Sequence, residues 1–410
     1  MSGVAPRIVI FGAGNIGRSF IGQVFSRGGW EVVFVDIDEA LVSAVNERRA
    51  YEVVVRGPDF SEEIIEVRNV RAVDGRDDGA VIAELAAADL AATCVGKPAL
   101  RGIIGPLASG LIARERARRG DRSGARPAVP PLDLIIAEND RQAAETLRLG
   151  LMGALPSGFP LGERLGLVET SIGKMVPIIR AADLATDRLR VFAEAHNDLI
   201  VDRRGFLGPL PLVPDLVPVG NILAYVDRKL FMHNLGHAAV AYLGSLADPS
   251  ARLISEALEL PSIRGAARRA MAEAAAALLR EYPAEFTAPG LEAHIEDLLA
   301  RFGNAVLGDT VYRVGRDLPR KLHRSDRIVG AALLCERHGL PWGGIAAVFA
   351  AALRFNAVDE SGRPFAADAD AKALLEQRGL EAFMTELCVL DATEDLDARV
   401  RGKLGEAVLG

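Results

Sequence analysis

The feature that most constrains the fold is a glycine-rich turn close to the start of the chain. A short β-branched run at residues 7–11 leads directly into the turn, Gly12-Ala-Gly-Asn-Ile-Gly17. A helical pattern follows at residues 18–26, and a second β-branched run at residues 31–35 ends at Asp36. This order predicts a strand, a tight turn, a helix and a second strand, which is typical of the start of a parallel α/β sheet.

Each part of the turn suits the binding of a dinucleotide. Gly12 permits the tight turn, Gly14 lets the backbone approach a pyrophosphate, and Gly17 lets the helix pack closely on the strand. Asp36 lies 19 residues after Gly17, where it can accept hydrogen bonds from both ribose hydroxyls and would repel a 2′-phosphate, so NAD is favoured over NADP. The alternative is a glycine turn that binds no nucleotide. The predicted cofactor-binding residues of the turn are Gly12, Ala13, Gly14, Asn15, Ile16 and Gly17.

Further strand patterns place two more residues near the cofactor. In a doubly wound sheet, ligands bind at the carboxyl ends of the strands. Gly96 and Asn139 each follow a predicted strand, so we expect both to lie beside the nicotinamide. The amide of Asn139 could donate to an oxygen that becomes an alkoxide, or Asn139 could cap a helix at residues 141–149. The predicted strands are residues 64–73, 90–95, 132–137, 167–177 and 189–194.

A proline-rich stretch at residues 209–218 is the expected region of a domain boundary, and helical patterns dominate after it. We therefore predict an α/β, Rossmann-like NAD-binding domain with a strand extension over residues 1–205. A mainly α-helical domain over residues 206–410 would supply the substrate site. Before the boundary, a basic cluster could be an anion patch or a solvated helix end and loop. Its members are Arg114, Arg116, Arg118, Arg119, Arg122 and Arg126.

The composition excludes several classes of protein. The net charge is −7, and no basic run extends along a whole face, which argues against nucleic acid as a partner. The three cysteines are far apart and lack zinc-ligand spacing, so neither a disulfide scaffold nor a zinc site is expected. The sequence shows neither a signal peptide nor an apolar run long enough to span a membrane. We expect a cytoplasmic protein, a monomer or homodimer, with a small-molecule substrate.

A helical pattern at residues 225–242 carries three polar residues, Lys229, Asn234 and His237. At about 100° per residue, His237 falls about 80° and Asn234 about 140° from Lys229, so the three share roughly one side of the helix. The alternative is a partly buried helix whose lysine reaches the solvent. His233 and His237 have the spacing of metal ligands, but a third ligand with recognisable spacing is missing from the sequence, so we expect a metal-free site.

These motifs resemble one family. Residues 11–18, with Phe20-Ile-Gly22, look like the start of mannitol-1-phosphate 5-dehydrogenases. The spacing Lys229-x4-Asn234-x2-His237 resembles the active-site signature of the polyol-specific long-chain dehydrogenases. Residues 309–316, 320–322 and 350–355 also look like the C-terminal half of that family.

The resemblance implies a metal-independent reaction with NAD. Lys229 matches the general acid/base of the family, and Asn234 and His237 match the residues that hold and orient the reacting oxygen. Asn139 matches the family's Glu-Asn element and would join Asn234 in stabilising an oxyanion. The expected reaction interconverts D-mannitol 1-phosphate and D-fructose 6-phosphate.

The sequence departs from the family pattern near the expected substrate contacts. Gly173-Lys174 stands where Asp-Arg is usual, and Asn197 stands in a region where a Trp is common. A related dehydrogenase of an unphosphorylated polyol or hexuronate is therefore an alternative, as is a non-catalytic NAD-binding protein. The candidate substrate residues are Lys174, Asn197, Arg316, Arg320 and Lys321, with Arg203 and Arg204 as further candidates for holding a phosphate.

Overall fold

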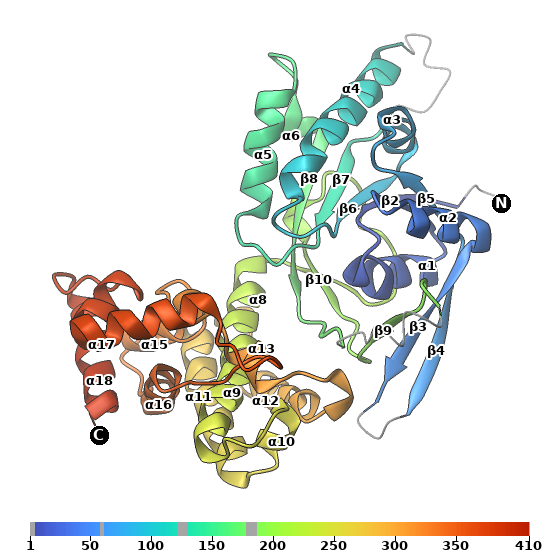
Figure 1. Cartoon of the computed structure of the whole chain (residues 1–410). Helices are drawn as coiled ribbons and strands as arrows, with labels where there is room; N and C mark the ends of the chain where they lie inside the picture. Colours follow the sequence, from blue (N-terminus) through green and yellow to red (C-terminus); the bar gives the residue numbers. More distant parts are fainter. Residues whose placement is uncertain (1–4, 58–60, 121–128, 178–186, 410) are drawn as a thin grey trace. The chain divides into compact units, whose positions relative to one another are not determined.

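The computed structural model describes residues 5–57, 61–120, 129–177 and 187–409. The chain divides into two compact units, Met1–Ile222 and Leu223–Gly410. In Figure 1 the first unit is coloured from blue to green, and the second from yellow-green to red.

The first unit is built on an eight-stranded sheet with the order β11-β10-β8-β7-β6-β1-β2-β5. Neighbours from β5 to β8 are parallel, and successive strands run outward from β1 on one side and from β6 on the other. This is the topology of a doubly wound dinucleotide-binding sheet. The strands are β1 (Arg7–Phe11), β2 (Glu31–Asp36), β5 (Val70–Asp74), β6 (Leu90–Thr93), β7 (Leu132–Ile136), β8 (Leu165–Ile172), β10 (Leu199–Asp202) and β11 (Leu216–Val219).

Both faces of this sheet are buried. In β1, Ile8 and Ile10 belong to one core and Val9 and Phe11 to the other, which explains the continuous apolar sequence of the strand. The first core includes side chains of η1, α1 and α2, and the second includes side chains of α3, α4 and α5. The helices of this unit include η1 (Gly17–Gly22), α1 (Gln23–Arg27), α2 (Glu39–Arg48), α3 (Asp78–Ala87), η2 (Leu100–Ile103), α4 (Ile104–Gly120), α5 (Ala143–Ala154), α6 (Leu161–Arg164) and η3 (Arg203–Gly205).

A second, three-stranded sheet was not predicted. Its order is β4-β3-β9, with β3 (Ala50–Arg56), β4 (Glu62–Arg68) and β9 (Val191–Ala193). The single strand predicted at residues 64–73 is wrong, because Asn69, with a φ of +58°, separates β4 from β5. The two strands belong to different sheets. The sequence pattern did not show this break, since apolar residues continue on both sides of it.

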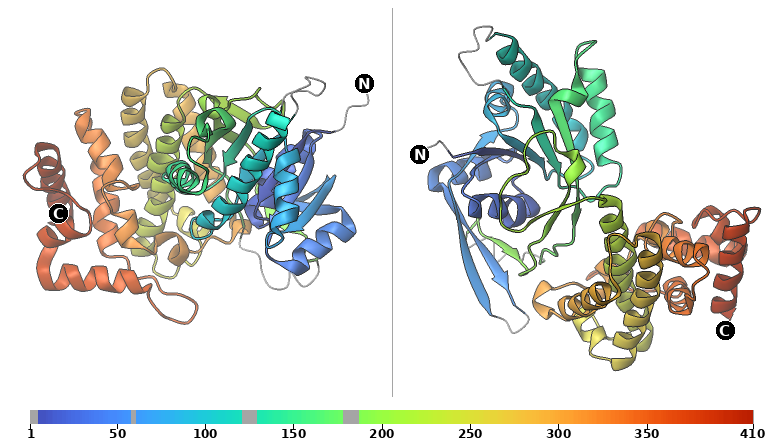
Figure 2. Two further views of the ribbon diagram at one scale, coloured as in Figure 1. Left: turned by 90° about the horizontal axis from the view of Figure 1, so that it is seen from above. Right: turned by 180° about the vertical axis from the view of Figure 1, so that it is seen from behind.

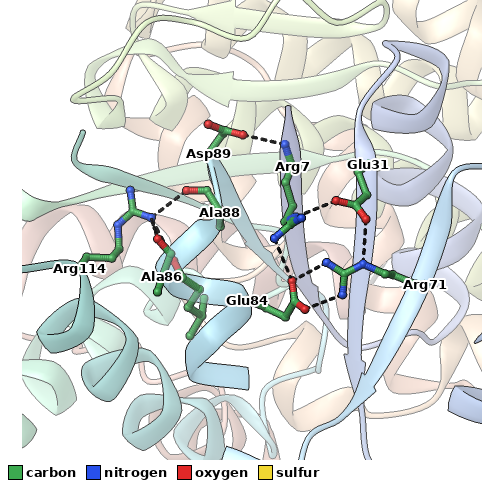
Figure 3. A network of polar contacts seen from close by, with 9 residues as sticks. Arg7, Glu31, Arg71, Glu84, Ala86, Ala88, Asp89 and Arg114 are labelled. Atoms are coloured by element: carbon green, nitrogen blue, oxygen red, sulfur yellow. Dashed lines mark hydrogen bonds and ion pairs between the residues drawn. The ribbon is translucent and has the colours of Figure 1, made fainter. Parts of the chain in front are cut away.

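Ion pairs join β1, β2, β5 and α3 (Figure 3). The guanidinium of Arg7 lies 2.7 Å from Glu31, and that of Arg71 lies 2.8 Å from Glu31 and 2.5 Å from Glu84. Arg71 and Glu84 are less than one-fifth exposed, so this network is better shielded from solvent than an ordinary surface pair.

Within the described residues, one arginine of the basic cluster on α4 is buried, whereas Arg116, Arg118 and Arg119 are exposed, as in a solvated helix end. Arg114 is buried and donates to the carbonyl oxygens of Leu85, Ala88 and Pro130, so it serves neither as an anion patch nor as a solvated helix end. Figure 3 shows its contact with Ala88. Arg118 and Arg119 pair with Glu115 on the same helix. Arg122 and Arg126 lie outside the described residues.

The second unit consists of helices and one isolated bridge between Leu253 and Thr310 in the part that the structure describes (Figure 2). Its central helix, α9, packs closely because it carries glycine at two contacts. A Cβ at Gly236 would lie 2.3 Å from the sulfur of Met271, and one at Gly244 would lie 2.6 Å from the Cβ of Ala257. The helices are α8 (Ile222–Arg228), η4 (Lys229–Asn234), α9 (Leu235–Ala247), α10 (Ile254–Leu258), α11 (Pro261–Glu281), α12 (Ala288–Phe302), η5 (Ala305–Leu307), α13 (Val311–Gly315), α14 (Leu318–Lys321), α15 (Val329–Arg337), α16 (Gly343–Leu353), α17 (Ala366–Glu386) and α18 (Asp395–Leu409).

The predicted fold class, a Rossmann-like α/β domain followed by a mainly helical domain, is confirmed. We predicted the division between residues 205 and 206, whereas the first unit extends to Ile222. The reason is that β11 follows the predicted division but pairs with β10 in the large sheet. Among the described helices, none combines the length and apolar character needed to cross a membrane.

Candidate functional site

The glycine-rich turn after β1 is shaped by two contacts that leave no room for a side chain. Gly12 has a φ of +95°, and a Cβ there would lie 2.5 Å from the carbonyl oxygen of Cys94. A Cβ at Gly17 would lie 2.1 Å from the carbonyl oxygen of Gly12. Gly14 differs, because it is exposed and, its chain neighbours apart, no atom of the described residues lies within 4 Å of its Cβ position. The open space beside Gly14 is what close approach of a pyrophosphate to the backbone requires.

Asp36, at the carboxyl end of β2, braces the same turn. Its Oδ2 accepts a hydrogen bond from the N–H of Ala13 at 2.7 Å, and its Oδ1 accepts one from the N–H of Asp38 at 3.0 Å. Because each carboxylate oxygen can accept more than one hydrogen bond, Asp36 keeps capacity for ribose hydroxyls. Of the other predicted turn residues, Asn15 is exposed and Ile16 packs against the core of the unit.

Arg18 supports the turn with its side chain, a role that was not predicted from the sequence. It is buried, and its guanidinium donates to the carbonyl oxygens of Ala13 and Leu189, each at 2.7 Å. Burial lowers the pKa of Arg18. The helical pattern gave no signal that this arginine turns inward.

Gly96 and Asn139 follow β6 and β7, two neighbouring parallel strands, and both are exposed. The alternative role of Asn139 as a helix cap is wrong. Helix α5 begins at Ala143, its N-cap is Gln142, and the side chain of Asp140 accepts from the N–H of Gln142 at 3.2 Å. Asn139 therefore lies three residues before the N-cap of α5.

Lys229 and Asn234 are the first and last residues of a π-helical turn, η4. The N–H of Leu235 donates to the carbonyl oxygen of Leu230, five residues earlier. This spacing brings residues five apart closer to one face than an α-helix does, so the angle of about 140° expected for Asn234 is too large. Such turns inside α-helices occur frequently at functional sites.

The amine of Lys229 titrates far below its ordinary range. Burial and the positive charge of Arg327 lower the pKa of Lys229 to about 8. Arg327 is buried, and its Nε donates to Asp326 at 2.7 Å. Arg327 was not among the predicted site residues, although it continues the basic run that contains Arg320 and Lys321.

His237 is neutral at physiological pH. Burial, together with the charges of Arg327, Arg313 and other cations, lowers its pKa to about 3. Its ring stacks on Phe302, with centroids 4.7 Å apart and planes 5° from parallel. Its Nε2 lies 3.4 Å from Oδ2 of Asp309, and this carboxylate also pairs with Arg313. The imidazole is thus held on one side by a ring and faces a carboxylate at its tip.

Of the five predicted phosphate-binding cations, the three in the second unit differ in their surroundings. The guanidinium of Arg316 lies 5.6 Å from the ring centres of Tyr312 and Phe365. The Nε of Arg320 lies 2.5 Å from Asp317. Lys321 is buried, its Nζ donates to the carbonyl oxygen of Arg316, and burial lowers its pKa to about 7. The structure thus brings Lys321, rather than Arg320, into the interior of the unit.

Lys174 and Asn197 contact each other in the first unit. The Nζ of Lys174 donates to Oδ1 of Asn197 at 2.8 Å and to the carbonyl oxygen of His196 at 3.0 Å. The Nδ2 of Asn197 donates to Asp215 at 2.8 Å. The residue at the Gly173-Lys174 departure from the family pattern therefore braces a neighbouring loop. Arg203 and Arg204 are exposed, and Arg204 pairs with Asp202.

His233 is buried, with its ring centre 6.2 Å from that of His237 and 5.5 Å from that of Phe302. Burial is the main cause that lowers its pKa well below the usual value. Within the described ranges, no group of three or more His, Cys, Asp or Glu side chains is arranged to hold a metal ion.

Both halves of the chain match models of one protein family. Residues 6–213 match the mannitol dehydrogenase Rossmann domain, and residues 221–398 match the mannitol dehydrogenase C-terminal domain. The chain belongs to the mannitol dehydrogenase family. It is therefore an oxidoreductase of the polyol dehydrogenase type, with a dinucleotide-binding N-terminal domain.

Solved structures agree with this family fold. A D-sorbitol dehydrogenase in substrate-free form is 16% identical with a TM-score of 0.78, over 99% of this chain and 95% of that chain. The Pseudomonas fluorescens mannitol 2-dehydrogenase, in a ternary complex with NAD and D-mannitol, is 16% identical with a TM-score of 0.68, over 98% of this chain and 92% of that one. At this identity the likeness to the two structures shows the fold alone.

Proposed function

We propose that this member of the mannitol dehydrogenase family is an NAD-dependent, metal-independent oxidoreductase that interconverts D-mannitol 1-phosphate and D-fructose 6-phosphate. The observation that carries the proposal is Lys229, whose pKa is lowered to about 8 on a π-helical turn. A general base works best when its pKa lies near the working pH. An ordinary lysine, with a pKa of about 10.4, would remain protonated.

Lys229 performs the proton transfer in this proposal. In alcohol oxidation its neutral amine accepts the proton of the substrate hydroxyl, and in ketone reduction its ammonium returns that proton. The positive charge of Arg327, which helps to lower the pKa of Lys229, also favours an alkoxide nearby.

The two asparagines stabilise the developing alkoxide. The amide groups of Asn234 and Asn139 donate hydrogen bonds without competing for the proton. His237, being neutral, orients the reacting oxygen rather than protonating it. Stacking on Phe302 keeps the imidazole in one orientation, as this task requires.

The cofactor site fits NAD. When bound, NAD supplies the acceptor for the hydride that leaves the alcohol carbon. The open space beside Gly14 suits its pyrophosphate, and the carboxylate of Asp36, which lies next to the turn, suits a ribose with free hydroxyls. A 2′-phosphate would meet the negative charge of Asp36, so we propose NAD rather than NADP.

The phosphate part of the proposal is supported by positive charge around the catalytic helix. Arg327, Arg313 and Lys321 all act on the pKa of His237, in a chain whose net charge is −7. A local cluster of cations in a chain that is acidic as a whole favours an anionic substrate.

A second candidate, a dehydrogenase of an unphosphorylated polyol or a hexuronate, is favoured by the carboxylates beside these cations. Arg313 pairs with Asp309, and Arg327 with Asp326. A substrate phosphate would have to compete with these carboxylates. A hexuronate needs one cationic partner, and a neutral polyol needs none.

The deciding experiment measures NADH oxidation with fructose 6-phosphate, fructose, tagaturonate and fructuronate at equal concentration. Turnover with fructose 6-phosphate alone would support the first candidate. Turnover only with an unphosphorylated sugar or a uronate would replace it by the second. The Lys229→Ala variant tests the remaining alternative, a non-catalytic NAD-binding protein. A large loss of turnover with NADH binding retained would exclude that alternative.

A further inference from the structure

The carboxylate of Glu138 spans the ends of two neighbouring strands. Its Oε1 accepts a hydrogen bond from the N–H of Val95, and its Oε2 accepts one from the N–H of Gly96, each at 2.9 Å. The backbone pairing of β6 with β7 continues to the N–H of Ala137, which donates to the carbonyl oxygen of Thr93 at 3.0 Å. Glu138 therefore joins the two segments just beyond the point where backbone pairing stops.

Asn139 is fixed from both sides by this arrangement. Its predecessor, Glu138, is bonded to Gly96, and its successor, Asp140, lies 3.3 Å from the Nζ of Lys97. The Lys97 side chain is 70% exposed, so solvent weakens that ion pair. Glu138 is buried, so its two partly buried hydrogen bonds are better shielded from water than that ion pair. The stronger of the two connections is thus made by Glu138.

The use of a buried carboxylate here calls for a reason beyond packing. Removing a charged group from water is unfavourable, and burial is the main cause that raises the pKa of Glu138. A carboxylate is, however, a rigid acceptor that can hold two successive N–H groups at fixed positions. Its position next to Asn139 suggests that this rigidity serves the site.

We propose that Glu138 is a positioning residue that fixes Gly96 and Asn139 relative to each other. The backbone beside the nicotinamide, at Gly96, and the amide of Asn139, which donates a hydrogen bond to the alkoxide, would thereby keep one relative position. This inference rests on the proposed function, because it takes the roles of Gly96 and Asn139 from there. Glu138 itself touches neither substrate nor cofactor. Its effect on turnover passes through the two segments that it joins.

The same strand supplies a matched control. Asp133, near the start of β7, is also buried, and its two oxygens accept from the N–H groups of Leu207 at 2.8 Å and Gly208 at 3.0 Å. Burial raises the pKa of Asp133 as it does that of Glu138. Asp133 is therefore chemically equivalent to Glu138, but it lies at the opposite end of β7 from Asn139.

The test compares Glu138→Gln with Asp133→Asn. Each amide keeps one acceptor oxygen and places an NH₂ group against the second backbone N–H. We expect both variants to lose thermal stability to a similar extent. Only Glu138→Gln is expected to lose kcat, by at least tenfold at saturating NADH, and to show a larger isotope effect with 4-deuterated NADH. A loosened strand end would slow hydride transfer in this way, whereas a loss of folded enzyme would leave the isotope effect unchanged.

A conservative variant keeps the test decisive if Glu138→Gln does not fold. Glu138→Asp retains the charge but shortens the side chain, so it should fold and recover only part of the lost turnover. An equal kcat for Glu138→Gln and Asp133→Asn, or for Glu138→Asp and the wild type, would overturn the inference. NADH binding followed by fluorescence separates this result from failure of the proposed function. A wild-type chain that does not bind NADH would overturn both.

Discussion

The imidazole of His237 lies flat on the ring of Phe302, with the two ring centres 4.7 Å apart. The two side chains come from different helices, α9 and α12, so the stack connects these helices at the site. It also limits the orientations of the imidazole to those parallel to the Phe302 ring.

Replacing Phe302 with Leu should therefore lower kcat/KM. Leucine keeps an apolar contact but removes the flat surface, and aromatic pairs contribute about 0.5–1.5 kcal/mol beyond their buried area. A loss of this size in transition-state stabilisation is a decrease of about two- to tenfold. The control is Phe286→Leu, since Phe286 is buried against Tyr225 in the same unit. Equal losses in kcat/KM for the two variants, after correction for folded protein, would contradict a role for the stack.

The pH dependence of kcat/KM should report Lys229 and not His237. The pKa of Lys229 is lowered to about 8, whereas that of His237 is lowered to about 3, below the range of ordinary assays. Oxidation requires the neutral amine, so its kcat/KM should rise with pH and level off above about 8. Reduction requires the ammonium and should fall above the same pH. A His237→Asn variant should keep this profile at lower activity. A midpoint near pH 6 in the wild-type profile would instead assign the titration to another group.

Much of the fold could be predicted from the sequence because local patterns determine it. The glycine turn between two β-branched runs indicated a parallel sheet, and strands β1, β2, β6 and β7 lie where apolar runs placed them. The pairing of β3 with β9 was missed, since it joins segments that are far apart in the chain. Such pairings depend on tertiary packing, which periodicity does not report.

The site was predictable in its residue types but not in its details. The motif spacing identified Lys229, Asn234 and His237, yet the π-helical turn could not be seen, because the spacing was interpreted with the periodicity of an α-helix. The burial of individual basic residues could not be predicted from the sequence either. Arg320 and Arg327 look alike in sequence, but Arg320 is exposed and Arg327 is buried, with its charge acting on Lys229.

Replacing Lys229 with Met should stabilise the fold at neutral pH. The folded-state pKa of about 8 lies below the ordinary value of 10.5, so the unfolded chain binds the proton more tightly. Stability therefore falls as pH decreases from 10.5 to about 8, and below that the penalty is complete, on the order of 3 kcal/mol. Methionine has a similar length and no charge, so it avoids this penalty.

The measurement is the melting temperature of Lys229→Met and wild type at pH 7 and pH 9.5. We expect the variant to melt higher at pH 7 and the difference to shrink at pH 9.5. Lys403→Met is the control, because Lys403 is half-exposed and pairs with Glu336, so its loss should not stabilise the fold. If the melting temperatures of Lys229→Met and wild type are equal at pH 7, or if their difference grows with pH, the buried amine carries no such penalty.

Asp36 should determine cofactor selectivity through its charge. It should also maintain the shape of the turn through its hydrogen bond. The two roles can be separated, because an asparagine keeps an oxygen that accepts from the N–H of Ala13 while it removes the charge. For Asp36→Asn, we expect the ratio of NADPH to NADH affinity to rise by about tenfold, which corresponds to about 1.4 kcal/mol of relieved repulsion. Asp36→Ala should change selectivity in the same direction and also lower the melting temperature, since the N–H of Ala13 loses its acceptor.

Fluorescence titration with both cofactors measures this affinity ratio. It is done at low ionic strength, because salt would screen the repulsion. An unchanged ratio in both variants would mean that the charge of Asp36 does not act on the ribose, and the preference for NAD would then require another cause.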